Sequence, residues 1–105
     1  MMKLTALYGH PTNPDVFEKY CAETHTPLAL NIKGVDKIEL TKFVSAPDGG
    51  TPAHYRMAEL YFSSPDQLQQ SMGSPEGQAT AADLANFATG GVTLIIGSVE
   101  NLISK

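Results

Sequence analysis

The chain has 105 residues, 42% of them hydrophobic and 17% charged, and a formal net charge of -4. This length suits one domain, 1–105, and the composition is that of a globular protein rather than a disordered one. The seven Lys and Arg residues form no basic cluster and no apolar run approaches the ~20 residues of a membrane helix, so we expect neither a nucleic-acid nor a membrane partner.

The first half of the chain is predicted to form a strand, a helix and a second strand. The apolar stretch 4–9 is bounded by Gly, His and Pro, which is typical of a strand. An Asn-Pro pair at 13–14 predicts the start of a helix. Pro27 disfavours helical geometry at Thr26, so the helix should end or kink there, and 35–44 predicts the second strand. The expected buried stripe of the helix is Phe17, Tyr20, Cys21, Thr24 and Leu28.

The second half repeats this order. A Pro-Asp-Gly-Gly turn within 45–53 leads into 54–63, where side chains alternate as in a strand. Two Ser-Pro starts, at 64–65 and 74–75, predict a helical region in two pieces, and 92–100 predicts the last strand. The order βαββαβ predicts an α+β protein with a ferredoxin-like split βαβ fold and an antiparallel four-stranded sheet.

A homodimer is expected because helices cover one face of such a sheet. The other face would then expose more apolar surface than a soluble monomer usually does, and a second copy laid face to face would cover it. The predicted side chains of this face are Tyr55, Met57, Tyr61, Ile95 and Val99.

The stretch from Tyr20 to Leu28 holds the most reactive side chains. Cys21 and His25 are four residues apart, a spacing that suits a metal site or a thiolate-imidazole pair, but Cys21 also suits the buried stripe as a core residue. No HExxH, CxxC or nucleotide fingerprint is present, so we predict no metal and no cofactor. The lone cysteine allows no internal disulfide, which favours the cytoplasm.

Two residues are candidate catalytic groups. His25 is either a helix-end residue favoured by the helix dipole or an acid-base group that reaches the cavity between the sheets of a dimer. Glu59 lies mid-strand on the face that we expect the dimer to cover. It either reaches the cavity edge or pairs with a lysine such as Lys37 or Lys42, or else it acts as a general base or proton shuttle in an apolar pocket. The candidate substrate-binding residues, which are alternatively packing residues, are Tyr8, Tyr20, Tyr55, Met57 and Tyr61.

The segments "KLTALYG", "FEKYCAETHTPLA" and "SPEGQATAADLANFATGGV" resemble the EthD family of the dimeric α+β barrel superfamily. The resemblance implies a homodimer with a lipophilic cavity beside each sheet. It also implies that Tyr20, His25, Asp83 and Phe87 occupy the family's helix-end and third-helix positions. Proteins of this family are named for ethyl tert-butyl ether degradation and are loosely described as oxidoreductases.

Two functions follow from these observations. The first is a cofactor-free oxidoreductase, isomerase or cyclase of a small aromatic or ether-derived substrate, with His25 or Glu59 moving protons. The second is a non-catalytic protein that sequesters or delivers a hydrophobic metabolite. Convergence of His25, a tyrosine and Glu59 on one cavity would favour the enzyme, and dispersed positions would favour the binding protein.

Overall fold

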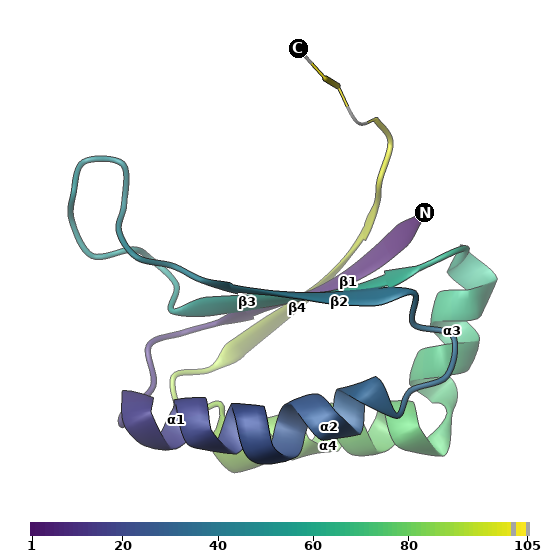
Figure 1. Cartoon of the computed structure of the whole chain (residues 1–105), viewed down its shortest axis with the longest axis horizontal. Helices are drawn as coiled ribbons and strands as arrows, with labels where there is room; N and C mark the ends of the chain where they lie inside the picture. Colours follow the sequence, from purple (N-terminus) through teal and green to yellow (C-terminus); the bar gives the residue numbers. More distant parts are fainter. Residues whose placement is uncertain (102, 105) are drawn as a thin grey trace.

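The computed structural model of the chain describes residues 1–101 and 103–104 and shows a four-stranded antiparallel sheet packed against helices (Figure 1). The strand order is β2-β3-β1-β4, so the two strands of each strand-helix-strand half are separated by a strand of the other half. The predicted ferredoxin-like fold is therefore confirmed. The strands are β1 (Met2–Tyr8), β2 (Lys37–Lys42), β3 (Arg56–Phe62) and β4 (Val92–Ser98).

The helical regions begin at the predicted capping residues. The side chain of Asn13 accepts the backbone N–H of the residue three positions ahead over 3.2 Å, and Ser64 and Ser74 do the same over 3.1 Å. A proline follows each cap, at a position where its missing N–H costs no hydrogen bond. The helical segments are α1 (Pro14–Tyr20), the π-helical turn η1 (Cys21–His25), α2 (Thr26–Leu30), α3 (Pro65–Gly73) and α4 (Pro75–Phe87).

All of these helices lie on one side of the sheet (Figure 1). Leu4 and Leu60 are register partners that face the helices, where Leu60 packs against Leu68 of α3. Their strand neighbours Thr5 and Glu59 therefore point to the opposite side. We call that opposite side the open face; its residues on β1, β3 and β4 are Lys3, Thr5, Leu7, Met57, Glu59, Tyr61, Thr93, Ile95 and Gly97.

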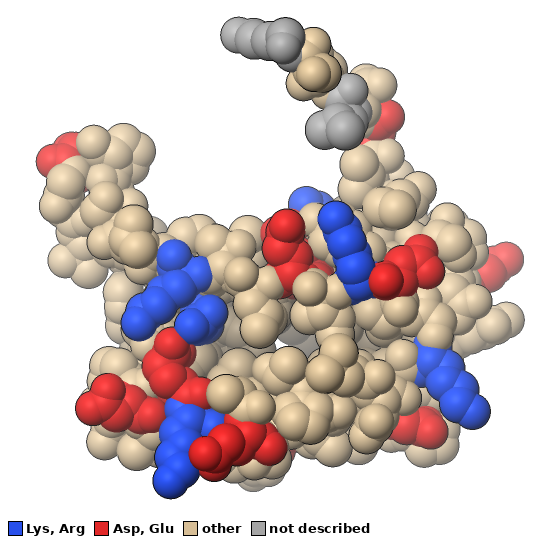
Figure 2. Space-filling model, viewed as in Figure 1, with Lys and Arg blue, Asp and Glu red and all other residues tan. Residues whose placement is uncertain are grey.

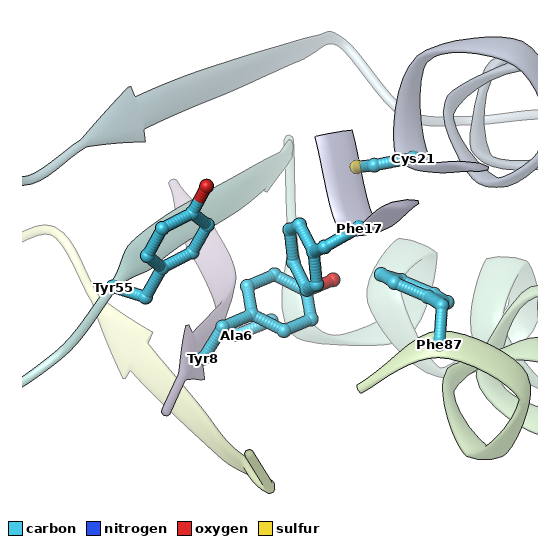
Figure 3. Close-up of a cluster of buried hydrophobic side chains, with 6 residues drawn as sticks. All are labelled: Ala6, Tyr8, Phe17, Cys21, Tyr55 and Phe87. Carbon is cyan, nitrogen blue, oxygen red and sulfur yellow. The ribbon is translucent and has the colours of Figure 1, made fainter. Parts of the chain in front are cut away.

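The core between α1, α4 and the sheet is aromatic (Figure 3). The ring centroid of Phe17 lies 5.2 Å from those of Tyr8 and Tyr55 and 5.1 Å from that of Phe87. Aromatic rings at such separations attract one another beyond the gain from burial alone. This cluster fixes the position of α4 relative to α1. A second cluster at the other end of the sheet contains Ile32, Leu60, Phe62 and Leu68.

The first helical region does not end near Thr26; it widens into η1 and continues through α2. Pro27 has no N–H to donate, and a proline ring clashes with the carbonyl four residues back in a regular helix. The wider turn contains one extra residue, and the Thr26 N–H bonds the carbonyl of Cys21, five residues back. The buried stripe shifts accordingly: Thr24, predicted to be buried, is exposed, and His25 is buried in its place.

Candidate functional site

His25, the last residue of η1, is buried against Asp83 of α4. Its Nδ1 lies 2.9 Å from Asp83 Oδ2, and the two residues are only 8% and 7% exposed. Its ring lies 4.6 Å from that of Phe87, centroid to centroid. Because the π turn contains one extra residue, His25 projects to the same side as Tyr20, five residues earlier. The expectation that His25 faces a cavity between two sheets is therefore wrong, since it lies on the helix side of its own sheet.

Three donors surround the Asp83 carboxylate. Besides His25, the Tyr20 hydroxyl donates to Oδ1 over 2.6 Å and the Asn86 side-chain amide donates to the same oxygen over 2.9 Å. Burial opposes ionisation of Asp83, but the hydrogen bonds from Tyr20, Asn86 and His25 outweigh it and lower its pKa. An ionised carboxylate has no proton to donate, so His25 Nδ1 carries the hydrogen. In the neutral ring, Nε2 is then the acceptor.

The ring of His25 lines a small apolar pocket between the sheet and the helices, with an enclosed volume of about 50 Å³. The exposed residues of its lining are Leu94 of β4 and Ala81 of α4, so the pocket opens between β4 and α4. The lining consists of Leu4, Ala6, Tyr8, His25, Ala58, Leu60, Met72, Thr80, Ala81, Leu84 and Leu94.

Besides His25, two lining residues carry a polar side-chain atom, Tyr8 and Thr80. The Thr80 hydroxyl donates to the backbone carbonyl of Glu76 over 2.8 Å, within its own helix. Burial raises the pKa of the Tyr8 hydroxyl, which therefore stays protonated and is able to donate a hydrogen bond. The pocket thus presents a histidine acceptor and a tyrosine donor in apolar surroundings.

The predicted substrate-binding residues other than Tyr8 lie outside this pocket. Tyr20 holds Asp83 and stacks on Phe87. Met57 and Tyr61 lie on the open face, as the alternation predicts. Tyr55 does not share that face, because it precedes the start of β3 and turns towards Phe17 on the helix side. Its buried hydroxyl has no hydrogen-bond partner within the described chain.

Glu59, the second candidate catalytic residue, lies on the open face and is 6% exposed. It pairs with a lysine, as one of the interpretations expected, but the partner is Lys3 of the neighbouring strand, Nζ to Oε2 2.6 Å, rather than Lys37 or Lys42. This hydrogen bond is the main reason that the pKa of Lys3 is raised. The sheet separates Glu59 from His25, so the two candidates do not share a cavity.

Two polar contacts near the site were not predicted. Asn86 lies one helical turn after Asp83 on α4, and its three-residue spacing was the available signal. Arg56 of β3 makes a two-point ion pair with Glu18 of α1, over 2.6 and 3.0 Å. This pair ties the first helix to the sheet. Lys and Arg lie close to Asp and Glu in Figure 2, which shows no broad patch of one sign.

Within residues 1–101 and 103–104, no group of three or more His, Cys, Asp and Glu side chains is placed to hold a metal ion. Cys21 is 8% exposed and belongs to the aromatic core, and burial raises the pKa of its thiol. No helix among the described residues is long and apolar enough to cross a membrane.

These features define an α+β protein of ferredoxin-like fold with a buried Asp-His pair beside an apolar pocket. A sequence model of the EthD domain matches residues 9–91, and the chain belongs to the EthD family. The chain is 40% identical over 103 residues to an uncharacterized 11.0 kDa protein in the thcB-thcC intergenic region of Rhodococcus erythropolis, covering 98% of this chain and 99% of that protein.

Solved structures agree with this assignment. An ethyl tert-butyl ether d (EthD) family protein from Bacillus halodurans matches with a TM-score of 0.90 and 36% identity, over 95% of this chain and 99% of that one. More distant structures share the fold alone. SnoaB, a cofactor-independent oxygenase from Streptomyces nogalater, has a TM-score of 0.66 at 15% identity, over 99% and 96% of the two chains. A dimeric protein of ferredoxin-like fold from Bacteroides fragilis has a TM-score of 0.64 at 14% identity, over 93% and 95%.

Proposed function

We propose that this protein is a cytoplasmic, cofactor-free enzyme that binds a small hydrophobic molecule, aromatic or ether-derived, in the pocket beside His25. The observation that carries this proposal is the buried His25–Asp83 pair, joined over 2.9 Å, whose imidazole also lines an apolar pocket. SnoaB, which shares the fold, is a cofactor-independent oxygenase, and this supports a reaction without metal or cofactor.

The reaction would begin with a proton transfer to His25. Asp83 orients the ring through Nδ1 and stabilises the imidazolium that forms when Nε2 accepts a proton. Tyr20 and Asn86 hold the carboxylate in place, so little rearrangement is needed as charge develops. The Tyr8 hydroxyl would donate a hydrogen bond to the atom of the ligand that gains negative charge.

A non-catalytic role in sequestering or delivering a hydrophobic metabolite is the second candidate function. The position of Glu59 favours this role. Glu59 lies on the open face, so among the described residues His25 is the one base that lines the pocket. In that case the Asp-His pair would recognise a polar group of the ligand without changing it.

We propose further that the single domain acts as a homodimer joined through the open face. Ile95 of β4 is 50% exposed and Val99, directly after β4, is 38% exposed, and no helix of the described residues covers the face. The β2–β3 loop (43–55) rises on the same side of the sheet and flanks the uncovered area (Figure 1). The fold is shared with a dimeric protein from Bacteroides fragilis, which supports this arrangement.

Incubation of the purified protein with a metabolite extract tests the catalytic function. We expect mass spectrometry to find a metabolite that is consumed by the wild-type chain and spared by His25→Gln. Glu59→Gln, a change on the other side of the sheet, is the matched control and should consume the same metabolite. Retention of a metabolite without any conversion would show that the binding function is the correct one.

A further inference from the structure

The pocket has one polar end and one open apolar end, and these restrict the molecule that it accepts. At the inner, buried end, the lining includes His25 and Tyr8, 8% and 2% exposed; the Nε2 of the first is able to accept a hydrogen bond and the hydroxyl of the second to donate one. At the outer end, Leu94 and Ala81 are exposed on the two sides of the opening. A ligand that satisfies both ends needs a hydroxyl at one end and an apolar extension at the other.

The charge of the lining determines which hydroxyl compounds fit. No Lys or Arg of the described residues lines the pocket, and the Asp83 carboxylate lies behind His25. A carboxylate or phosphate would lose its water on entering and would approach the negative charge of Asp83 without a Lys or Arg of the lining to pair with. A neutral molecule enters without this cost, and an acidic hydroxyl can then give its proton to His25.

The small enclosed volume determines the shape of the ligand. A cavity of ~150 Å³ accommodates benzene, whereas this pocket encloses about 50 Å³. The inner end therefore holds the hydroxyl and its adjoining atoms, and the rest of the molecule lies in the opening. Ile96, which also faces the helix side, is 53% exposed and continues the apolar surface of Leu94 along β4.

We infer that the ligand is a neutral, elongated apolar molecule with one weakly acidic hydroxyl, a phenol or an enol, whose apolar end passes between Leu94 and Ala81. This inference rests on the proposed function and names its substrate class. On proton transfer, the O–H bond breaks and its electron pair stays on oxygen, while the proton forms a new N–H bond at His25 Nε2. The products are a phenolate or enolate that accepts a hydrogen bond from Tyr8, and an imidazolium paired with Asp83.

Calorimetric titration of the wild-type chain with four probes tests the inference: 4-ethylphenol, 4-hexylphenol, 4-hexylanisole and 4-hexylbenzoate. We expect 4-hexylphenol to bind ~10-fold or more tightly than 4-hexylanisole, because the ether leaves Nε2 without a donor. The benzoate should bind more weakly than the phenol at neutral pH. The hexyl chain should improve affinity over the ethyl chain by roughly 2–4-fold for each methylene that the opening covers.

The opening is tested with Leu94→Glu, and Leu30→Glu at the exposed end of α2 is its control. Leu94→Glu should remove most of the gain from the hexyl chain and leave 4-ethylphenol within ~2-fold, whereas Leu30→Glu should change neither affinity. Equal binding of the phenol and the anisole, or tighter binding of the benzoate, would overturn the substrate class but leave the pocket as a binding site. If no probe binds, and no backbone amide of the pocket shifts in NMR spectra, the proposed function fails as well.

Discussion

Tyr20 and His25 bind the two different oxygens of one carboxylate, that of Asp83, although they stand five residues apart in a single helical region. In a regular α-helix, residues five apart project to different sides. The π turn between them removes this difference. Asp83 thus connects the tyrosine, the histidine and α4 into one hydrogen-bonded unit at the edge of the pocket.

His25→Gln is expected to lower the rate of substrate conversion by ~100-fold or more, the typical effect of losing a general base. The folded state should lose about 1 kcal/mol, because Asp83 keeps its bonds to Tyr20 and Asn86. Conversion is measured on the metabolite identified from the extract, and stability by thermal unfolding. An unchanged conversion rate together with a lower melting temperature would assign His25 to stability alone.

Asp83→Asn should change how stability depends on pH. The pKa of Asp83 in the folded chain lies below its ordinary value of 3.8, so the ionised carboxylate stabilises the fold above that value. The contribution is lost as the pH falls through the lower folded pKa. At neutral pH we expect the wild type to exceed the variant by ~1–2 kcal/mol in unfolding free energy. Urea titrations should show this difference shrinking below pH ~4; a constant difference would contradict the prediction.

Light scattering at micromolar concentration should give the mass of a dimer. Ile95→Glu places a charge on the open face, and we expect it to produce monomers because an unpaired charge in an interface is costly. Leu30→Glu, also a change of an exposed apolar residue but on α2, should remain dimeric. A monomeric wild type would disprove the dimer, and a dimeric Ile95→Glu would place the interface elsewhere.

Gly77→Ala should destabilise the junction of α3 and α4. A Cβ atom at Gly77 would collide with the backbone oxygen of Ser71 and lie 2.7 Å from the Cα of Met72, so α4 would have to move. We expect a loss of ~1–3 kcal/mol in chemical unfolding. Gly73→Ala is the matched control, since its Cβ meets no atom of the described residues within 4 Å. Equal stability of the two variants would contradict this account of the packing.

The parts of the fold that depend on residues close together in the sequence were predictable. Ser64 and Ser74 cap their helices through bonds to residues three ahead, and alternation correctly placed Met57 and Tyr61 on one face. The alternation failed at Tyr55 because the strand starts one residue later. A local pattern of alternation does not indicate at which residue of a bent segment a strand begins.

The site was less predictable because its contacts join distant parts of the chain. His25 and Asp83 are 58 residues apart, and only the resemblance to the EthD family named Asp83 as a position of interest. The partner of Glu59 depends on the register of β1 and β3, which brings Lys3 rather than Lys37 or Lys42 to it. Pro27 was the visible signal of the π turn, but it is equally compatible with a helix end.

Because η1 contains one extra residue, the direction in which His25 projects depends on the number of residues in this turn as well as on their types. Ala22, Glu23 and Thr24 are all exposed, so many side chains would fit at these positions. Deleting one of them would leave Tyr20 and His25 four residues apart, the spacing at which a regular α-helix places two side chains on the same side. Both side chains would then still project towards Asp83. A residue inserted in this turn would instead rotate His25 by ~100° relative to Tyr20 and turn the imidazole away from the pocket. An insertion in this turn is therefore more damaging to the site than a deletion or a substitution.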